Sequence, residues 1–434
     1  MNNYLKISQN LLNFIYDSPS PFHVVNNMKS ILDSNHYEEL KDSEKWNLVK
    51  GGKYYTIKNQ SAIIAFCIGN KQIEDCGIRI VGAHTDSPTF KIKPNPQIFS
   101  KGNYIKLNTE VYGGPILNTW MDRPLSLAGR VTVRSKNPFN PEMKLVNVKR
   151  PILIIPNLAI HMNRSVNKGY ELNKQKDMLP ILGLINEKLE EEDYLLRILC
   201  KELNVEKSDI LDFELLLYEF EKGCIMGIDD EFISSSKLDD LSMVHAGLNA
   251  LIESDIEDSS QMLVCFDNEE VGSSTKQGAD SPLLSSIIER IVIGLGKDRE
   301  DYFRTLSKSF MISCDSAHAV HPNTEEKADP TNKPIINKGP VIKINANQSY
   351  TSDAYSTSVY EEICDLAEVP VQKFVNRSDE RGGSTIGPIS STHVNIDSVD
   401  VGTALLAMHS VRELGGVKDQ FYMIESLKKF YTLK

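Results

Sequence analysis

The sequence lacks several features that would place it in other protein classes. No apolar run approaches the roughly 18 residues that a membrane span requires, and residues 1–25 have no basic start followed by a long apolar core, so we predict neither a membrane span nor a signal peptide. The seven cysteines are dispersed and form no Cys-x-x-Cys pair, which favours a reducing compartment. We therefore expect a cytoplasmic protein.

The chain also lacks an excess of positive charge. The chain has 48 Lys and Arg residues against 59 Asp and Glu residues, and its formal net charge is -11. It contains no basic block or arm, which argues against nucleic-acid binding. The hydrophobic content of 41% and the charged content of 25% are typical of a globular protein. The 434 residues are enough for two domains, or for one domain with a large insertion.

Three common catalytic signatures are absent as well. There is no His-Glu-x-x-His motif, so a single zinc ion held by one helix is disfavoured. There is no Gly-x-Ser-x-Gly elbow for a nucleophilic serine, and the sequence "GLGK" (294–297) lacks the spacing of a phosphate loop.

The apolar pattern predicts an α/β fold with a mostly parallel sheet flanked by helices and a β-rich insertion. Strands and helices alternate in residues 1–91 and again in residues 228–434. Residues 92–227 instead contain short β-like pieces, "YIKLNTEVY", "LAGRVTVRS" and "ILIIPNLAIHM", that proline and glycine punctuate, and a charged helix is predicted over 184–203. We therefore divide the chain at these boundaries.

Three predicted strands end in side chains of the kind that bind metal ions. "GIRIVGA" leads to His84 and Asp86, "QMLVCFDN" leads to Glu269 and Glu270, and "KSFMISC" leads to Asp315. Sites in open α/β sheets gather outside the carboxyl ends of the strands, so we expect these side chains to lie together. Taken singly, a His-x-Asp pair is usually a surface or turn pair, and adjacent glutamates usually mark a solvated loop.

Two further candidates lie on predicted helices. Asp239 and its neighbour Asp240 open the helix "LDDLSMVHAGL", where an aspartate alone is better explained as an N-cap. His409 lies in the predicted closing helix "TALLAMHSVREL", where a single histidine is typically a hydrogen-bonded core residue. Together with the strand-end residues, these side chains supply enough ligands for two zinc ions about 3.5–4 Å apart. One of Glu269 and Glu270 would bind a metal, and the other would stand over the water between the ions.

With these residues the chain resembles the aspartyl aminopeptidase family of di-zinc metallopeptidases almost from end to end. The resembling motifs occur in the family's order, and they are "SPSPFHVV" (18–25), "GAHTDSP" (82–88), "IPNLAIHMNR" (155–164), "KLDDL" (237–241), "DNEEVGS" (267–273), "SCDSAHAVHPN" (313–323), "NANQSY" (345–350), "GGSTIGPI" (382–389) and "AMHSVRE" (407–413). No metal-site position departs from the family's pattern.

The resemblance implies a metal ligand set. Asp239 would bridge both zinc ions. His84 and Asp315 would complete the ligands of one ion, and Glu270 and His409 would complete those of the other. Zinc is the expected metal, although cobalt and manganese also suit such ligands.

The resemblance also implies roles beyond the ligands. Glu269 would be the general base, and Asp86 would be a further catalytic-site residue that accepts a hydrogen bond from the imidazole of His84 and orients it. His161 would reach the substrate site of a neighbouring subunit. Lys343 would line the pocket for an acidic substrate side chain, whereas without the resemblance an edge-strand lysine that discourages aggregation is the better explanation.

For the whole protein, the resemblance implies a protease domain made from both ends of the chain and a dimerisation domain at 92–227. It also implies a hollow tetrahedral homododecamer built from dimers. The expected activity is removal of the N-terminal residue from short peptides, with a preference for Asp or Glu. Two alternatives stay open, namely a di-zinc aminopeptidase of broader or different specificity and a non-catalytic shell or binding protein on the same fold.

Overall fold

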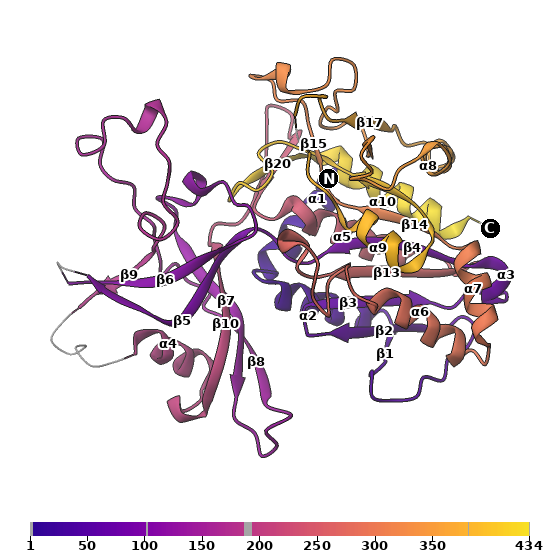
Figure 1. Cartoon of the computed structure of the whole chain (residues 1–434), viewed down its shortest axis with the longest axis horizontal. Helices are drawn as coiled ribbons and strands as arrows, with labels where there is room; N and C mark the ends of the chain where they lie inside the picture. The colour runs from indigo at the N-terminus through magenta and orange to yellow at the C-terminus, as the bar shows by residue number, and fades with distance from the viewer. Residues whose placement is uncertain (1–2, 101–102, 186–192, 381, 434) are drawn as a thin grey trace.

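The computed structural model describes residues 3–100, 103–185, 193–380 and 382–433, and a nine-stranded sheet is its main element (Figure 1). In spatial order the strands are β1 (Glu38–Glu39), β2 (Lys53–Lys58), β3 (Ala62–Cys67), β13 (Ser260–Phe266), β4 (Ile78–His84), β14 (Phe310–Cys314), β18 (Asp397–Gly402), β16 (Val341–Ile344) and β17 (Gln372–Val375). The four central strands, β13, β4, β14 and β18, run parallel to one another.

Helices cover both faces of this sheet. One face carries α1 (Asn3–Asp17), α2 (Pro21–Ser34), α5 (Leu238–Glu253), α8 (Ala354–Leu366) and α10 (Val417–Thr432), and the other carries α3 (Ile73–Cys76), α6 (Leu283–Gly294), α7 (Arg299–Lys308) and α9 (Ile386–Val394). Alternate residues of β13 pack into the two cores, Leu263 into the first and Met262 into the second. This double burial explains the unbroken apolar run of the strand. The predicted α/β class is confirmed, and we call this assembly the α/β part.

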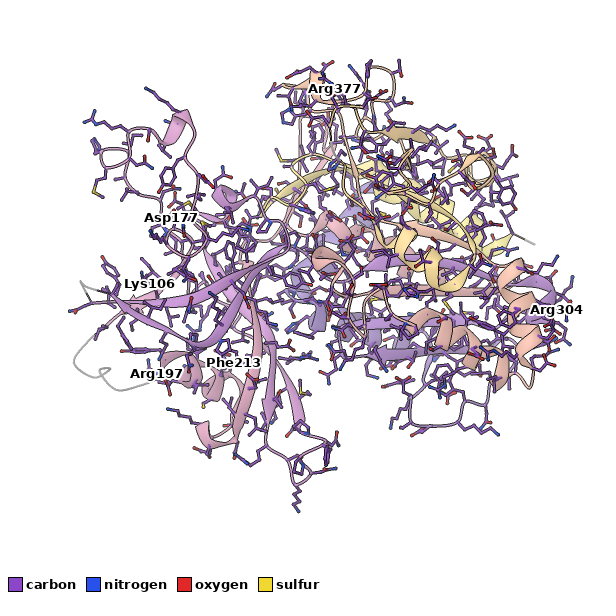
Figure 2. The ribbon with its side chains drawn as sticks, in the orientation of Figure 1. Lys106, Asp177, Arg197, Phe213, Arg304 and Arg377 are labelled. Carbon is purple, nitrogen blue, oxygen red and sulfur yellow. The ribbon has the colours of Figure 1, made fainter. Side chains whose placement is uncertain are left out.

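A second, antiparallel sheet is built from the chain between β4 and α5, and we call it the inserted part. Its strand order is β8 (Glu142–Asn147), β7 (Leu125–Val133), β10 (Ile210–Glu219), β5 (Thr89–Ser100), β6 (Tyr104–Tyr112) and β9 (Ile181–Leu184). Helix α4 (Tyr194–Leu203) packs on it through Leu195 and Leu199. In Figure 2 the labelled Lys106, Asp177 and Phe213 belong to this part, whereas Arg304 lies at the opposite end of the molecule.

Short elements complete the chain. Two small sheets are formed by β11 (Cys224–Met226), β12 (Phe232–Ser235) and β20 (Glu413–Gly416), and by β15 (Ala317–His318) and β19 (Ala404–Leu405). The short 3₁₀ turns are η1 (Leu117–Trp120), η2 (Val166–Lys168), η3 (Lys207–Asp209), η4 (Glu269–Val271) and η5 (Glu325–Lys327). Among the described residues, no helix combines the length and the apolar character that a membrane crossing requires.

The structure corrects the predicted closing helix over 403–414. This segment forms β19, a tight turn and β20, because β19 pairs with β15 and β20 pairs with β12. Ala407 and His409 both have positive φ, which a helix does not allow. His409 therefore lies in the turn between two strands.

Two predictions within 92–227 also need correction. The predicted helix over 184–203 is observed only as α4, because residue 184 ends strand β9, and 186–192 lie outside the described residues. The stretch "ILIIPNLAIHM" forms two isolated bridges, at Leu153 and Ile154, and not a full strand. Pro156, two residues after Ile154, supplies no backbone N–H to extend the pairing. That residues 92–227 serve as a dimerisation domain stays a prediction.

Candidate metal centre

Three neighbouring strands of the large sheet end at one edge. β4 lies between β13 and β14 and is parallel to both. β4 ends at His84, η4 with Glu269 and Glu270 follows β13, and Asp315 follows β14. The shared strand direction therefore brings these side chains to the same edge of the sheet, as the sequence predicts.

The side chains at this edge form three groups in which possible ligand atoms lie within 4.8 Å of one another. The first group is His84, Asp239, Asp240 and Asp315, the second is His84, Glu269 and Glu270, and the third is Asp239, Glu270 and His409. Every ligand that the sequence suggests belongs to one of these groups. Asp239 belongs to the first and the third, which is the placement that a bridging carboxylate needs.

The two carboxylate oxygens of Asp239 face two different histidines. Oδ1 lies 3.6 Å from Nε2 of His84, and Oδ2 lies 3.5 Å from Nε2 of His409. Nε2 of His409 also lies 3.4 Å from Oε2 of Glu270. The two imidazoles thus lie near different oxygens of Asp239, one in the first group and one in the third.

Burial and like charge control the ionisation of these groups. Burial raises the pKa of Glu270 well above its usual value, and the nearby Asp239 carboxylate raises it further. Burial also raises the pKa of Glu269, against the attraction of His84. For Asp239 burial acts in the same direction, but the nearby imidazoles of His409 and His84 hold its pKa below the usual range. The cluster therefore favours any added positive charge.

The donor set fits a divalent metal ion. Oδ1 of Asp239, Oδ1 of Asp240 and Oε1 of Glu270 are buried and have no hydrogen-bond partner among the described residues. A buried carboxylate oxygen without a donor is costly unless a cation approaches it. Carboxylate oxygen together with imidazole nitrogen is a ligand combination that zinc accepts.

Asp86 contacts more than the histidine it is predicted to orient. Nδ1 of His84 lies 3.1 Å from the backbone oxygen of Asp86 and 3.3 Å from its Oδ1, so the backbone shares this role with the side chain. In addition, Oδ1 and Oδ2 of Asp86 accept the backbone N–H groups of Glu269 and Glu270, both at 3.1 Å. The carboxylate of Asp86 thus fixes the turn that carries both glutamates.

The sequence does not single out Glu413, which supports two of the candidate ligands. Its Oε2 accepts the backbone N–H of Asp239 at 3.0 Å, and its Oε1 accepts that of His409 at 2.7 Å. Glu413 is 2% exposed, and burial raises its pKa to about 8. It lies in the same "AMHSVRE" motif as His409, so the sequence carried a signal for it. Asp240 also supports a candidate ligand through the backbone, since its Oδ2 accepts the backbone N–H of His84 at 3.0 Å.

Lys343 lies inside the sheet beside the first group. Strand β16 runs between β18 and β17, so the alternative of an edge-strand lysine is wrong. The side chain is buried, and its Nζ lies 3.6 Å from Oδ2 of Asp315 and donates to the backbone oxygen of Ser316 at 3.2 Å. Burial lowers the pKa of Lys343, but Asp315 reverses this and holds the pKa above its usual value.

His161 lies in an exposed turn of the inserted part. It belongs to none of the three groups that the described residues form. The structure of one chain therefore does not bring His161 to the candidate metal centre, and its predicted role across subunits stays a prediction.

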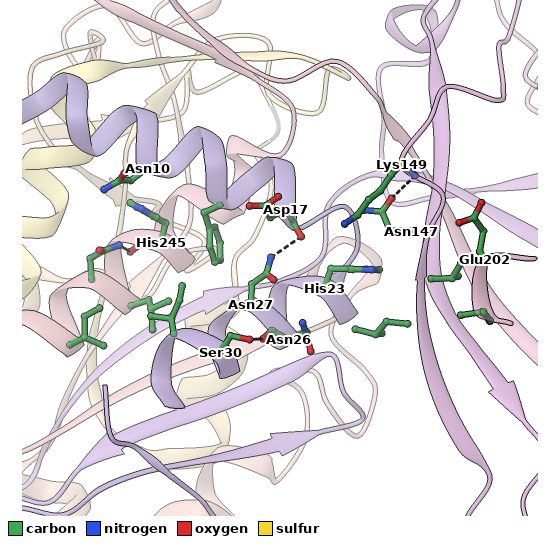
Figure 3. Close-up of a pocket in the computed structure, with 18 residues that line it drawn as sticks. Asn10, Asp17, His23, Asn26, Asn27, Ser30, Asn147, Lys149, Glu202 and His245 are labelled. Carbon is green, nitrogen blue, oxygen red and sulfur yellow. Dashed lines mark hydrogen bonds between the residues drawn. The ribbon is translucent and has the colours of Figure 1, made fainter. Parts of the chain in front are cut away.

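A cleft of about 820 Å³ lies elsewhere, between α1, α2 and α5 on one side and β8 and α4 on the other (Figure 3). His23, Lys149 and His245 are among the labelled residues that line it. No member of the three groups lines this cleft. Burial lowers the pKa of His23 to about 4, and its Nδ1 lies 2.7 Å from Oγ of Ser20, which fits the expectation of a structural histidine. The candidate metal centre at the strand ends is therefore separate from this cleft.

Comparison with known proteins agrees with this geometry. Residues 14–431 match the family model described as "Aminopeptidase I zinc metalloprotease (M18)". The chain belongs to the M18 family of zinc aminopeptidases. It is 63% identical over 433 residues to a "Probable M18 family aminopeptidase 2" of Clostridium novyi, with 100% of each chain covered. It is 41% identical to a protein of the same name from Ectopseudomonas mendocina, with 98% of each covered.

Solved structures show the same fold. The chain superposes with a TM-score of 0.95 and 37% identity on a chain from the cryo-EM structure of the Ape4 and Nbr1 complex, covering 99% of this chain and 86% of that one. The S. cerevisiae mApe1 dodecamer gives a TM-score of 0.87 and 29% identity, with 99% and 97% covered. The resemblance to the aspartyl aminopeptidase family is thus confirmed, as is a metallo-aminopeptidase activity class.

Removal of a third-group ligand should weaken metal binding in this M18 protein. We expect Glu270→Ala and His409→Ala each to reduce zinc affinity by more than about tenfold, because even partners outside the ligand set typically contribute 10–100-fold. Zinc is measured by mass spectrometry after dialysis against zinc buffers. His393→Ala, which removes an exposed histidine paired with Asp280, is the control and should retain normal zinc affinity. Unchanged zinc affinity in both ligand variants would exclude the third group as a metal site.

Proposed function

We propose that this M18 aminopeptidase holds two divalent metal ions and removes the N-terminal residue of short peptides, with a preference for Asp or Glu. The observation that carries this proposal is Asp239, whose two carboxylate oxygens face His84 and His409 from a buried position. A carboxylate with partners on both sides suits a bridging ligand better than a single-ion site.

The candidate ligands divide between the two ions through Asp239. His84 and Asp315 would share one ion with it, and Glu270 and His409 would share the other. When bound, the ions would lower the pKa of a water molecule and polarise the carbonyl of the scissile bond. The protein's contribution is to hold the ligands at fixed separations through the ends of β4, β13 and β14 and the turn between β19 and β20.

Glu269 is the proposed general base. It belongs to the second group with His84 and Glu270, yet it is not a member of the first or the third. Its carboxylate would accept a proton from the attacking water and deliver it to the leaving amine. The hydrogen bond from its backbone N–H to Asp86 keeps the residue in place while its side chain stays free for this exchange.

Loss of the base should separate catalysis from metal binding. Glu269→Gln keeps the size of the side chain but removes the proton acceptor, so we expect hydrolysis to fall by 10²–10⁴-fold while zinc content stays near that of the wild type. Peptide hydrolysis and bound zinc are measured on the same preparation. Retention of more than about a tenth of the activity would show that another group accepts the proton.

The proposed preference for acidic residues depends on Lys343. A buried substrate carboxylate needs a cationic partner, and Lys343 is a buried cation beside the first group. The specific observation favouring the alternative is that Lys343 is already paired with Asp315 and Ser316. If this pairing persists with substrate bound, the enzyme has a broader or different specificity.

Substrate comparison distinguishes these two possibilities. Lys343→Ala should lower kcat/KM for N-terminal Asp or Glu by about 10- to 150-fold more than for Leu or Ala, because a charge-assisted contact contributes roughly 1.5–3 kcal/mol. Lys338→Ala, an exposed lysine ahead of the same strand, is the matched control and should have no effect. An equal loss for acidic and neutral substrates would assign Lys343 to the support of Asp315 alone.

We further propose that the inserted part joins subunits into a dodecamer and brings His161 to a neighbour's site. The turn around His161 exposes apolar side chains, with Leu158, Ile160 and Met162 at 52%, 47% and 69% exposure. Adjacent exposed apolar residues of this kind often mark an interaction surface. The mApe1 relative, which covers the inserted part as well, is a dodecamer.

Complementation tests a shared active site directly. His161→Ala and Glu269→Gln should each be inactive alone, but their co-expression should restore activity. About a quarter of the wild-type rate is expected, since half of randomly paired dimers are mixed and each mixed dimer has one intact site. Light scattering should also show an assembly far larger than a dimer. A fully active monomer, or co-expression without recovery, would contradict the role of His161.

A further inference from the structure

The last residue of β6 connects the inserted part to the candidate metal centre of the same chain. The hydroxyl of Tyr112 donates a hydrogen bond to Oδ2 of Asp86 at 2.7 Å and accepts one from Nδ2 of Asn268 at 2.8 Å. Asp86 in turn accepts the backbone N–H groups of Glu269 and Glu270. A single phenol from the inserted sheet thus contacts both the carboxylate and the amide that hold the turn bearing the two glutamates.

The direction of these hydrogen bonds is fixed by their surroundings. Oδ1 of Asn268 accepts from Oγ1 of Thr275 at 3.0 Å and from Nε2 of Gln277 at 2.7 Å, so its NH₂ group faces Tyr112. Burial, together with the neighbouring Asp86 carboxylate, raises the pKa of the Tyr112 phenol, which therefore stays protonated. The phenol must then donate to Asp86.

The two residues after Tyr112 approach the third group. Gly113 has φ +71, a conformation that favours glycine, and a Cβ atom there would lie 3.1 Å from Cβ of Glu270, which is tighter than an ordinary contact. The carbonyl oxygen of Gly114 lies 3.2 Å from Nδ1 of His409 and accepts its hydrogen. That bond leaves Nε2 of His409 directed at Asp239 and Glu270.

We propose that Tyr112–Gly114 is a positioning segment that sets the geometry of the general base and of the third-group ligands. The inference rests on the functions proposed above for Glu269, Glu270 and His409. Glu270 and His409 come from two separate turns outside the inserted part, and one short stretch of the inserted part approaches both. The inserted part thus completes the active site of its own chain, in addition to any contact that it makes with other subunits.

Tyr112→Phe tests the segment because it removes one hydroxyl and leaves the ring. We expect kcat to fall by about 10- to 100-fold with KM changed less than about twofold, and zinc affinity to fall by about tenfold, as for other partners that orient ligands. Tyr104→Phe, at the opposite and exposed end of β6, is the matched control and should behave as the wild type. Excess zinc should restore occupancy but not kcat, because the position of Glu269 stays altered.

A purely structural role for Tyr112 predicts a different result. It would lower the melting temperature and leave both zinc affinity and kcat unchanged well below that temperature, and this outcome would overturn the proposal. The zinc measurement is repeated in the Glu269→Gln background, where activity plays no part. Failure of the base assignment appears as an active Glu269→Gln enzyme, whereas failure of this inference appears as normal zinc affinity in Tyr112→Phe.

A second variant addresses the glycine. Gly113→Ala should weaken zinc binding by more than about tenfold, because its methyl group meets Glu270. Gly51→Ala is the matched control, since Gly51 has nearly the same φ of +73 but nothing within 4 Å of the added methyl group. Equal zinc affinity in the two alanine variants would overturn the role of Gly113.

Discussion

Repulsion among carboxylates that share a dry space is the constraint on which the rest of this structure depends. Asp239, Asp240 and Asp315 lie in one group with His84, and burial raises the pKa of Asp240 well above its usual value. Such a cluster is stable only when positive charge lies among its members. His84, Lys343 and His409 can supply part of that charge, and the buried oxygens left without donors are suited to binding a cation.

Four buried carboxylates of the site differ in how their oxygens are satisfied. Both oxygens of Asp86 and both oxygens of Glu413 accept hydrogen bonds from backbone N–H groups. Asp239 and Glu270 each leave one buried oxygen with no donor among the described residues. The first kind is suited to holding the peptide backbone in position, and the second is suited to binding a cation. Hydrogen bonding thus separates Asp86 and Glu413 from Asp239 and Glu270, whereas Asp240 combines both features, because its Oδ2 accepts the backbone N–H of His84 and its Oδ1 has no donor among the described residues.

Much of the fold and of the candidate site could be predicted from the sequence. The strand-end residues His84, Glu269 and Asp315 were accessible because unbroken apolar runs mark buried parallel strands, and such strands end at one edge of a sheet. The prediction of a closing helix over 403–414 was wrong because the apolar pattern of this segment also suits short strands. The pairing of β19 with β15 and of β20 with β12 selects the strands. His409 was nevertheless a correct candidate for the cluster.

Other features depend on contacts between distant segments and could not be predicted. Glu413 meets Asp239 across 174 residues, and Tyr112 meets Asn268 across 156. The position of β16 inside the sheet depends on strand order, which a local pattern does not contain, so the choice between an edge lysine and a buried one stayed open. The periodicity of apolar residues indicates which face of a segment is buried, but it does not indicate which other segment packs against that face.

The interrupted sheet has a consequence for how the chain acquires its structure during translation. β3 and β4 are made before the inserted part, yet the strand that lies between them, β13, is made after it. The inserted sheet is contiguous in sequence, so its strands can pair while the ribosome is still making β13 and β14. Until then β3 and β4 have open edges of apolar sequence, a state that invites pairing with other chains. Contacts of such large sequence separation also slow folding. The edge of the sheet that carries the candidate metal centre is therefore among the last parts of the molecule to form.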